Sequence, residues 1–234
     1  MMLLTLLLLA APEETPRLRH GAYVAFLPTA ERVGLRLTSI AHGNRADPLT
    51  WRYAFGGGGP IGEESWVALG EVAEVGIDPA PPRLGVVCLN AGWSLARAAF
   101  DGAVWAIVAA AGRQCTLVDE ADFHLFLPAG KTGAVAVGAS VTREGCRVRL
   151  SAGEEVVADE SGDFDQPKVF RLPAGAGDRL IRLEILPPGV SGLNLDDVEL
   201  TVTEGFAPYL APSAECAETL GRRWVAWQAQ HPSS

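Results

Sequence analysis

The sequence predicts an all-β protein of tandem antiparallel β-sandwiches, jelly-roll-like and closed by a short C-terminal α-helix. Three observations predict this fold: apolar and polar residues alternate, turn motifs recur at short intervals, and two parts of the chain resemble each other. Hydrophobic residues make up 48% of the 234 residues and charged residues 20%, which is typical of a chain that folds around a core.

Alternation with a period of two indicates half-buried strands. In residues 33–38, Val33, Leu35 and Leu37 point to one side while Arg36 and Thr38 point to the other. Between such segments lie stretches rich in glycine and proline, namely 56–60, 78–82, 128–130, 173–175 and 187–189. No strand is followed by the helical stretch that a parallel crossover needs, so the pattern favours a β-sandwich over βαβ units.

The internal similarity suggests a duplication. Phe26-Leu27-Pro28 recurs as Phe126-Leu127-Pro128, and the strands that follow, 33–37 and 133–137, also align. We therefore expect one β-sandwich domain over 19–112 and a second over 119–205, with the boundary between 112 and 120. Chance is the alternative, because any two all-β segments share such patterns.

The period changes near the C-terminus, and we expect a helix over 213–229. Cys216, Leu220, Trp224 and Trp227 fall on one helical face, although Gly221 weakens the pattern. This face either packs back onto a sheet or docks a partner.

The N-terminal residues 1–11 form an apolar run that ends in Ala10 and Ala11, which is the shape of a signal peptide. The run has no Lys or Arg in front of it, and a truncated gene start or a hydrophobic β-strand are the alternatives. It is too short to span a bilayer, and no later segment is long enough to do so. We expect an extracytoplasmic protein, secreted or periplasmic, with no transmembrane segment in its mature form.

The formal net charge of −9 argues against a nucleic-acid partner, because phosphate binding needs clustered Lys and Arg. The four cysteines, at positions 88, 115, 146 and 216, either form disulfides in an oxidising compartment or are isolated buried thiols. Their wide spacing is not that of a zinc site.

No catalytic motif is present. The four histidines lie far apart in the sequence, and no Ser or Cys has the sequence neighbourhood of a nucleophile. We therefore expect a protein that is not an enzyme; a hydrolase would need carboxylates such as Asp163, Asp165 and Asp197 to converge.

Two acidic stretches stand out, and the first is a candidate for calcium, which prefers oxygen ligands. Residues 159–165 look like an acidic loop and are either a calcium loop or a solvated turn. The second stretch is the strand Leu195-Asp196-Asp197-Val198-Glu199-Leu200.

That strand resembles the closing strand of galactose-binding-like jelly rolls, which serve as carbohydrate-binding modules. The opening of the same unit, around residues 126–130, is similar to secreted bacterial β-sandwich domains of the pre-peptidase C-terminal type. The resemblance covers residues 119–205 and implies a structural calcium with Asp196 and Asp197 among its ligands.

Sugar binding uses exposed aromatic rings with polar groups beside them. Trp51 and Tyr53 share one strand face with Phe55, which is either a binding platform or part of the core. Trp93 follows the turn residues Asn90-Ala91-Gly92 and is expected to face solvent. We expect a non-enzymatic binding module for a glycan or another cell-surface component.

The alternative is a structural or interaction domain of an envelope or secreted protein complex. In that case Trp224 and Trp227 of the C-terminal helix are the expected contact with the partner protein.

Overall fold

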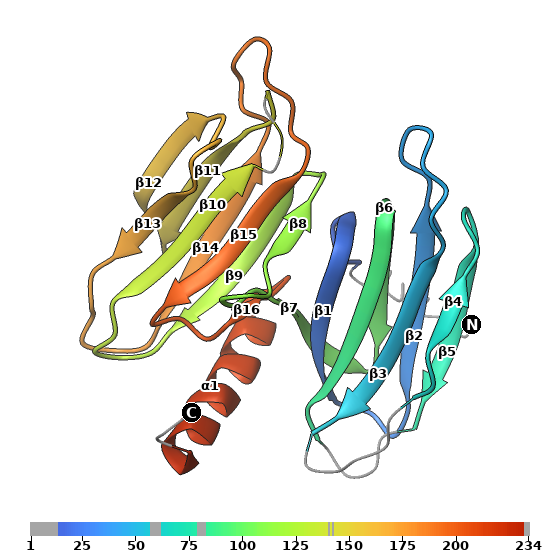
Figure 1. Ribbon diagram of the computed structural model, residues 1–234. Coiled ribbons are helices and arrows are strands. Elements are labelled where there is room, and N and C mark those ends of the chain that lie inside the picture. Colours follow the sequence, from blue (N-terminus) through green and yellow to red (C-terminus); the bar gives the residue numbers. More distant parts are fainter. Residues whose placement is uncertain (1–13, 57–61, 79–82, 140, 142, 232–234) are drawn as a thin grey trace, which may run out of the picture.

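The protein is an antiparallel β structure with one C-terminal helix, which confirms the predicted fold class (Figure 1). The computed structural model describes residues 14–56, 62–78, 83–139, 141 and 143–231. Within these ranges it contains sixteen strands and one α-helix. The predicted signal peptide, residues 1–11, lies outside the described residues.

The first unit is sandwich-like, and its strands belong to one continuous sheet in which the two longest strands are bent. Its strands are β1 (Leu18–Pro28), β2 (Val33–Ile40), β3 (Leu49–Phe55), β4 (Ser65–Val67), β5 (Val72–Ile77), β6 (Gly85–Asp101) and β7 (Ala103–Val108). The first half of β6 pairs with β3 and its second half with β2. The bend of β6 lies at Gly92, whose φ of 55° suits a residue without a Cβ atom. Strand β1 bends beside it, with a register shift between Arg19 and Gly21.

The second unit is a sandwich of two four-stranded layers. Its strands are β8 (Cys115–Leu117), β9 (Ala121–Leu127), β10 (Gly133–Ala139), β11 (Cys146–Ala152), β12 (Glu155–Gly162), β13 (Lys168–Leu172), β14 (Arg179–Leu186) and β15 (Val198–Glu204). One layer has the order β13-β10-β15-β8 and the other β12-β11-β14-β9. The two layers pack apolar residues such as Val135, Val148 and Leu183 between them.

The acidic stretch 159–165 is not a loop through its whole length, because its first residues belong to β12. Asp159 lies directly opposite Arg149 of β11 and forms ion pairs with both Arg147 and Arg149. The neighbouring arginines hold the pKa of Asp159 at about 2, mainly through the hydrogen bond from Arg147. Cross-strand charge pairing of this kind stabilises a hairpin, and the sequence pattern alone did not reveal it.

Strand β8 joins the two units. It lies within the predicted boundary of 112–120, and Leu117 pairs with Leu18 of β1 on one side and with Val198 of β15 on the other. One sheet therefore continues from the first sandwich into the second, and the buried residues of both units form one continuous hydrophobic core.

The predicted duplication remains a prediction. The matched segments open both units in the same manner, since β1 and β9 are each followed by a turn and by β2 or β10. The pairing then differs: β1 pairs with both β6 and β7, whereas β9 pairs with β14 and, at His124, with Ala211.

The four cysteines are free thiols, so no disulfide links them in this structure. Cys115, Cys146 and Cys216 are buried, and Cys88 is half-buried. Burial raises the pKa of Cys115 and of Cys146 to about 12, which makes both thiols unreactive at neutral pH.

Helix α1 (Ala214–Gln230) lies below the two units and contacts both of them (Figure 1). Its N-cap is Ser213, whose side chain accepts a hydrogen bond from the backbone N–H of Cys216 at 3.3 Å. The helix packs on β9 of the second unit and on β7 of the first, and the short strand β16 (Tyr209–Leu210) precedes it and pairs with β7.

No helix among the described residues is long and apolar enough to cross a membrane.

Gly221, which weakened the sequence pattern, lies where α1 packs against Phe126 of β9. A Cβ atom added there would overlap the ring of Phe126. The absence of a side chain therefore allows the helix to lie against the aromatic ring, and packing rather than helix propensity explains the residue.

We predict that Gly221→Ala destabilises the protein, although alanine is the better helix former. The gain in helix propensity is about 1 kcal/mol, whereas forcing extra atoms into a packed interface costs about 1–3 kcal/mol. Urea unfolding measures the difference. Ala226→Gly, at an exposed position of the same helix, reports the propensity effect alone. A stabilised Gly221→Ala variant would contradict the close packing.

Candidate functional site

At the bend in β1, two neighbouring side chains point toward different parts of the molecule. His20 has a φ of 59°, in the left-handed region, and the β1–β6 register shifts around it. Arg19 reaches toward the second unit, where it meets Asp197. The His20 ring meets the indole of Trp93 edge-on, with 4.9 Å between the ring centroids. The bend thus lies between the predicted ligand-binding Trp93 and the predicted calcium ligands.

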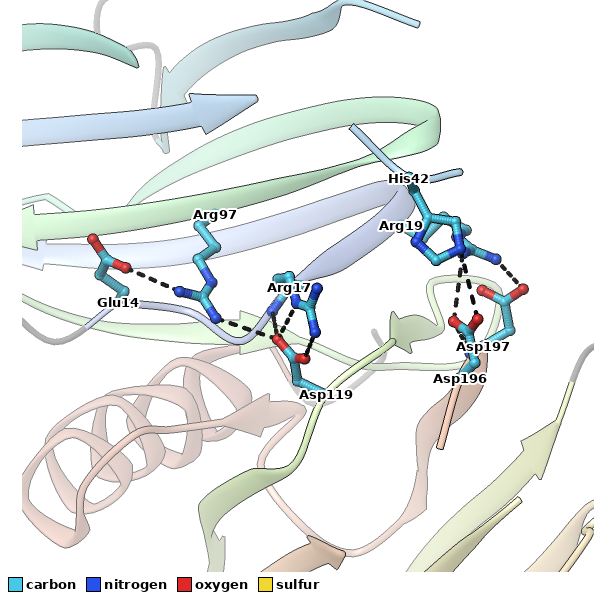
Figure 2. A network of polar contacts seen from close by, with 8 residues as sticks. All are labelled: Glu14, Arg17, Arg19, His42, Arg97, Asp119, Asp196 and Asp197. Carbon is cyan, nitrogen blue, oxygen red and sulfur yellow. Dashed lines mark hydrogen bonds and ion pairs between the residues drawn. The ribbon is translucent and has the colours of Figure 1, made fainter. Parts of the chain in front are cut away.

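Asp196 and Asp197 lie at the junction of the two units, just before β15 (Figure 2). The Asp197 carboxylate accepts a hydrogen bond from the Arg19 guanidinium, and both side chains are almost fully buried. Asp196 lies 3.4 Å from Arg19 and 3.6 Å from Nε2 of His42. Desolvation raises the pKa of Asp197 despite the attraction of Arg19.

This arrangement does not fit a calcium site built on the two aspartates. The guanidinium of Arg19 occupies the position beside Asp197 in which a bound cation would lie, and the imidazole of His42 faces Asp196. Over the described part of the chain, no group of three or more His, Cys, Asp or Glu side chains converges as metal ligands do. Calcium binding stays a prediction, and nothing below depends on it.

Glu144 is the third carboxylate of this junction. It lies beside Asn194, since the backbone N–H of Gly145 donates to the Asn194 carbonyl at 2.9 Å. Its pKa is raised to about 7, first because the group is desolvated and then because Asp197 and Asp196 repel its charge. Arg19 opposes this effect only in part.

A second chain of ion pairs runs along the same junction (Figure 2). Asp119, between β8 and β9, accepts hydrogen bonds from Arg17 and from Arg97 of β6. Arg97 also lies 3.5 Å from Glu14. Although desolvation raises the pKa of Asp119, the two arginines outweigh it and lower that pKa. These contacts fix the end of β6 against the start of the second unit.

Trp93 lies at the bend of β6 and is 51% exposed. Its backbone N–H donates to the Asp47 carboxylate at 2.8 Å, and the Arg45 guanidinium lies 5.5 Å from its ring centroid. Residues of the chain itself thus contact one face and one edge of the indole.

Trp51 and Tyr53 lie on the inner side of β3. Trp51 is only 7% exposed and belongs to the hydrophobic core, while Tyr53 is half-buried and meets Phe55 edge-on at 6.0 Å. The Trp51 ring is therefore mostly covered, although Trp51 is among the residues that line the depression described below. The alternating residues Thr50 and Arg52 face outward instead.

The outer face of this sheet carries aromatic and polar residues that the sequence reasoning did not bring together. Trp66 of β4 is 69% exposed and pairs with Thr50 of β3, which pairs in turn with Asn90 of β6. Partners in adjacent strands project to the same side, so these three residues form one row.

Beside this row lies a depression of about 400 Å³. Its lining includes Tyr23, Arg52, Glu64, Cys88 and Asn90. The Arg113 guanidinium lies over the Tyr23 ring, 4.6 Å from its centroid. The strand register alone decides which residues share this face, and a single sequence does not give that register.

No family model matches the chain, and no curated protein matches it.

We predict that breaking the Arg19–Asp197 pair destabilises the protein strongly. Asp197→Asn keeps the shape of the residue and tolerates its φ of 45°, but it removes the buried carboxylate of the pair and leaves Arg19 with only the more distant Asp196 at 3.4 Å. Loss of one partner of a buried pair costs about 3–5 kcal/mol in the free energy of unfolding, measured by urea titration.

The matched control is Arg147→Gln, which breaks the partly exposed pair with Asp159 and is expected to lower the free energy of unfolding far less, because solvent screens that pair. The double variant Arg19→Met with Asp197→Asn should lose less free energy of unfolding than Arg19→Met alone and Asp197→Asn alone lose together. Equal losses for Asp197→Asn and Arg147→Gln would contradict the burial of the junction pair.

We predict a pH-dependent effect of Glu144→Gln. The unfolded chain releases the Glu144 proton near pH 4.5, whereas the folded protein holds it up to about pH 7. The contribution of this group to the free energy of unfolding therefore falls as the pH rises through that interval and stays low above it. Glutamine stays neutral at every pH. The difference in melting temperature between variant and wild type should therefore shift in favour of the variant when the pH is raised from 4.5 to 8. A difference that does not change with pH would contradict the raised pKa.

Proposed function

We propose that the protein is an exported, non-enzymatic binding module that recognises a glycan on the outer face of β4, β3, β6 and β1. One observation carries the proposal: the exposed indole of Trp66 lies in one row with Thr50 and Asn90, beside the depression of about 400 Å³. Export rests on the sequence of residues 1–11 alone.

The chemistry of this face suits a sugar. The C–H groups of a pyranose ring pack on an indole, and its hydroxyl groups need donors and acceptors at the edge of that ring. Tyr23, Thr50 and Asn90 supply neutral groups of this kind. Arg52 and Glu64 add one charge of each sign, so the lining favours a neutral glycan over a charged one.

The Trp93 corner is a less suitable platform than the Trp66 row. The carboxylate beside Trp93 is already in use, because Asp47 accepts a hydrogen bond from the backbone N–H of Trp93. Arg45 also lies over the ring. A sugar there would have to displace contacts of the chain itself.

A structural or interaction domain of an envelope or secreted complex is the second candidate. Trp227 favours it, because 46% of this large apolar side chain is exposed on α1. Glycan binding separates the two candidates, since an interaction domain needs none.

The test is retention on insoluble polysaccharides, followed by a glycan array. We expect wild type to be retained, and we expect Trp66→Ala to lose at least tenfold in affinity because stacking on an aromatic ring is removed. Trp93→Ala is the matched control, a tryptophan of similar exposure outside the row, and should retain most of the affinity.

Loss of binding in Trp93→Ala but not in Trp66→Ala would move the site to the bend of β6 and overturn its placement on this face. Uniformly negative arrays with folded protein would overturn the glycan proposal and leave the interaction domain.

A further inference from the structure

A cavity of about 810 Å³ lies between α1 and the first unit. Trp224 and Trp227 of the helix line one side, and Leu84 and Val86 line the opposite side. Tyr209 of β16 and Pro208 also line it. Ligand cavities commonly measure about 300–1,000 Å³, so this one has room for a small molecule.

The fold leaves this cavity open because the helix contacts the sandwiches mainly through its first half. Cys216, Ala217, Leu220 and Gly221 are buried, whereas Trp224 is half-buried and Trp227 is 46% exposed. Residues three apart lie side by side on a helix, so the two indoles form a single wall. The His231 ring stacks on the Trp227 indole with 4.8 Å between the ring centroids, so a ligand contacts the part of this indole that His231 leaves exposed.

Two arginines are among the polar residues of the cavity. Arg83 and Arg223 line it together with His231, and no Asp or Glu is among the described lining residues, although the whole chain has a net charge of −9. Burial raises the pKa of Tyr209, and the charge of Arg223 opposes this effect only in part. The phenol therefore stays a neutral hydrogen-bond donor. The cavity therefore combines aromatic walls with localised positive charge.

We propose that this cavity binds a small organic acid with an extended apolar body, such as a medium-chain carboxylic acid. Its carboxylate lies at Arg83 and Arg223, and its apolar chain lies against Trp224 and Trp227. Each guanidinium has five N–H donors, so a carboxylate adds to the contacts that these arginines make within the chain. The helix C-terminus contributes about half a negative charge, which two guanidinium groups outweigh.

A free amphiphile suits the site better than an anionic bilayer. The binding surface is a recess, and the net charge of −9 opposes approach to a negatively charged membrane. The site is also separate from the proposed glycan face, because the depression beside Trp66 and this cavity share no lining residue.

The test is titration calorimetry of the full chain with dodecanoate, kept below its aggregation concentration, and with dodecyltrimethylammonium as a probe of equal tail length and opposite charge. We expect saturable dodecanoate binding at one site, at least tenfold tighter than that of the cationic amphiphile. The double variant Arg83→Gln with Arg223→Gln should lose at least tenfold in dodecanoate affinity, and Trp227→Ala should also weaken binding.

Trp66→Ala is the matched control and should bind dodecanoate as wild type does, so failure here is distinguishable from failure of the glycan proposal. Trp227 is exposed, so its variant keeps the test informative if the arginine variant fails to fold. Equal binding of the two amphiphiles, no saturable binding, or unchanged affinity in Trp227→Ala would each overturn the proposal. Co-sedimentation with vesicles of anionic phospholipid, in the absence of saturable dodecanoate binding, would overturn it in favour of a membrane surface.

Discussion

The buried pair between Arg19 and Asp197 is the constraint that holds the two sandwiches in one arrangement. Strand β8 is only three residues long, and few hydrogen bonds cross from it to β1 and β15. Two charges removed from water are tolerable only when each has the other at close range, so any rotation that separates them would carry a large desolvation cost. The backbone adopts a positive φ at His20 and again at Asp197, so an uncommon conformation lies on each side of the contact.

Both candidate binding surfaces follow from that fixed arrangement. Because the units cannot rotate freely, β16 can pair with β7 while α1 lies on β9, and the C-terminal segment bridges the two units. The helix then closes one side of a recess, and the start of β6 forms the opposite side. Val86, Cys88 and Asn90 alternate on that same strand face, so the cavity and the depression lie along one sheet while using different residues.

Alternation was sufficient to predict the fold class, since segments such as Val33–Leu37 became strands with their apolar side in the core. It could not predict β8, because three residues hold too little of a period to be recognised. It also could not decide which side of β3 is the core, because the same period-two pattern fits Trp51 inside or outside. Alternation also could not identify the partner of Asp197, since Arg19 lies 178 positions away in the sequence.

The exposed tryptophans differ in how much binding free energy their surroundings can add. An indole exposes about 150–250 Å² when fully accessible, so at about 25 cal/mol per Å² the exposed part of Trp66, Trp93 or Trp227 can contribute only about 2–4 kcal/mol. Even the upper value, about 4 kcal/mol, corresponds to a dissociation constant of only about 1 mM. Tighter binding therefore depends on the polar groups beside each ring. At Trp93 the chain itself already engages those groups. At Trp66 a polar depression adjoins the row, and at Trp227, on which the His231 ring stacks, two arginines line the cavity, so both proposals depend on these polar groups for the remaining binding free energy.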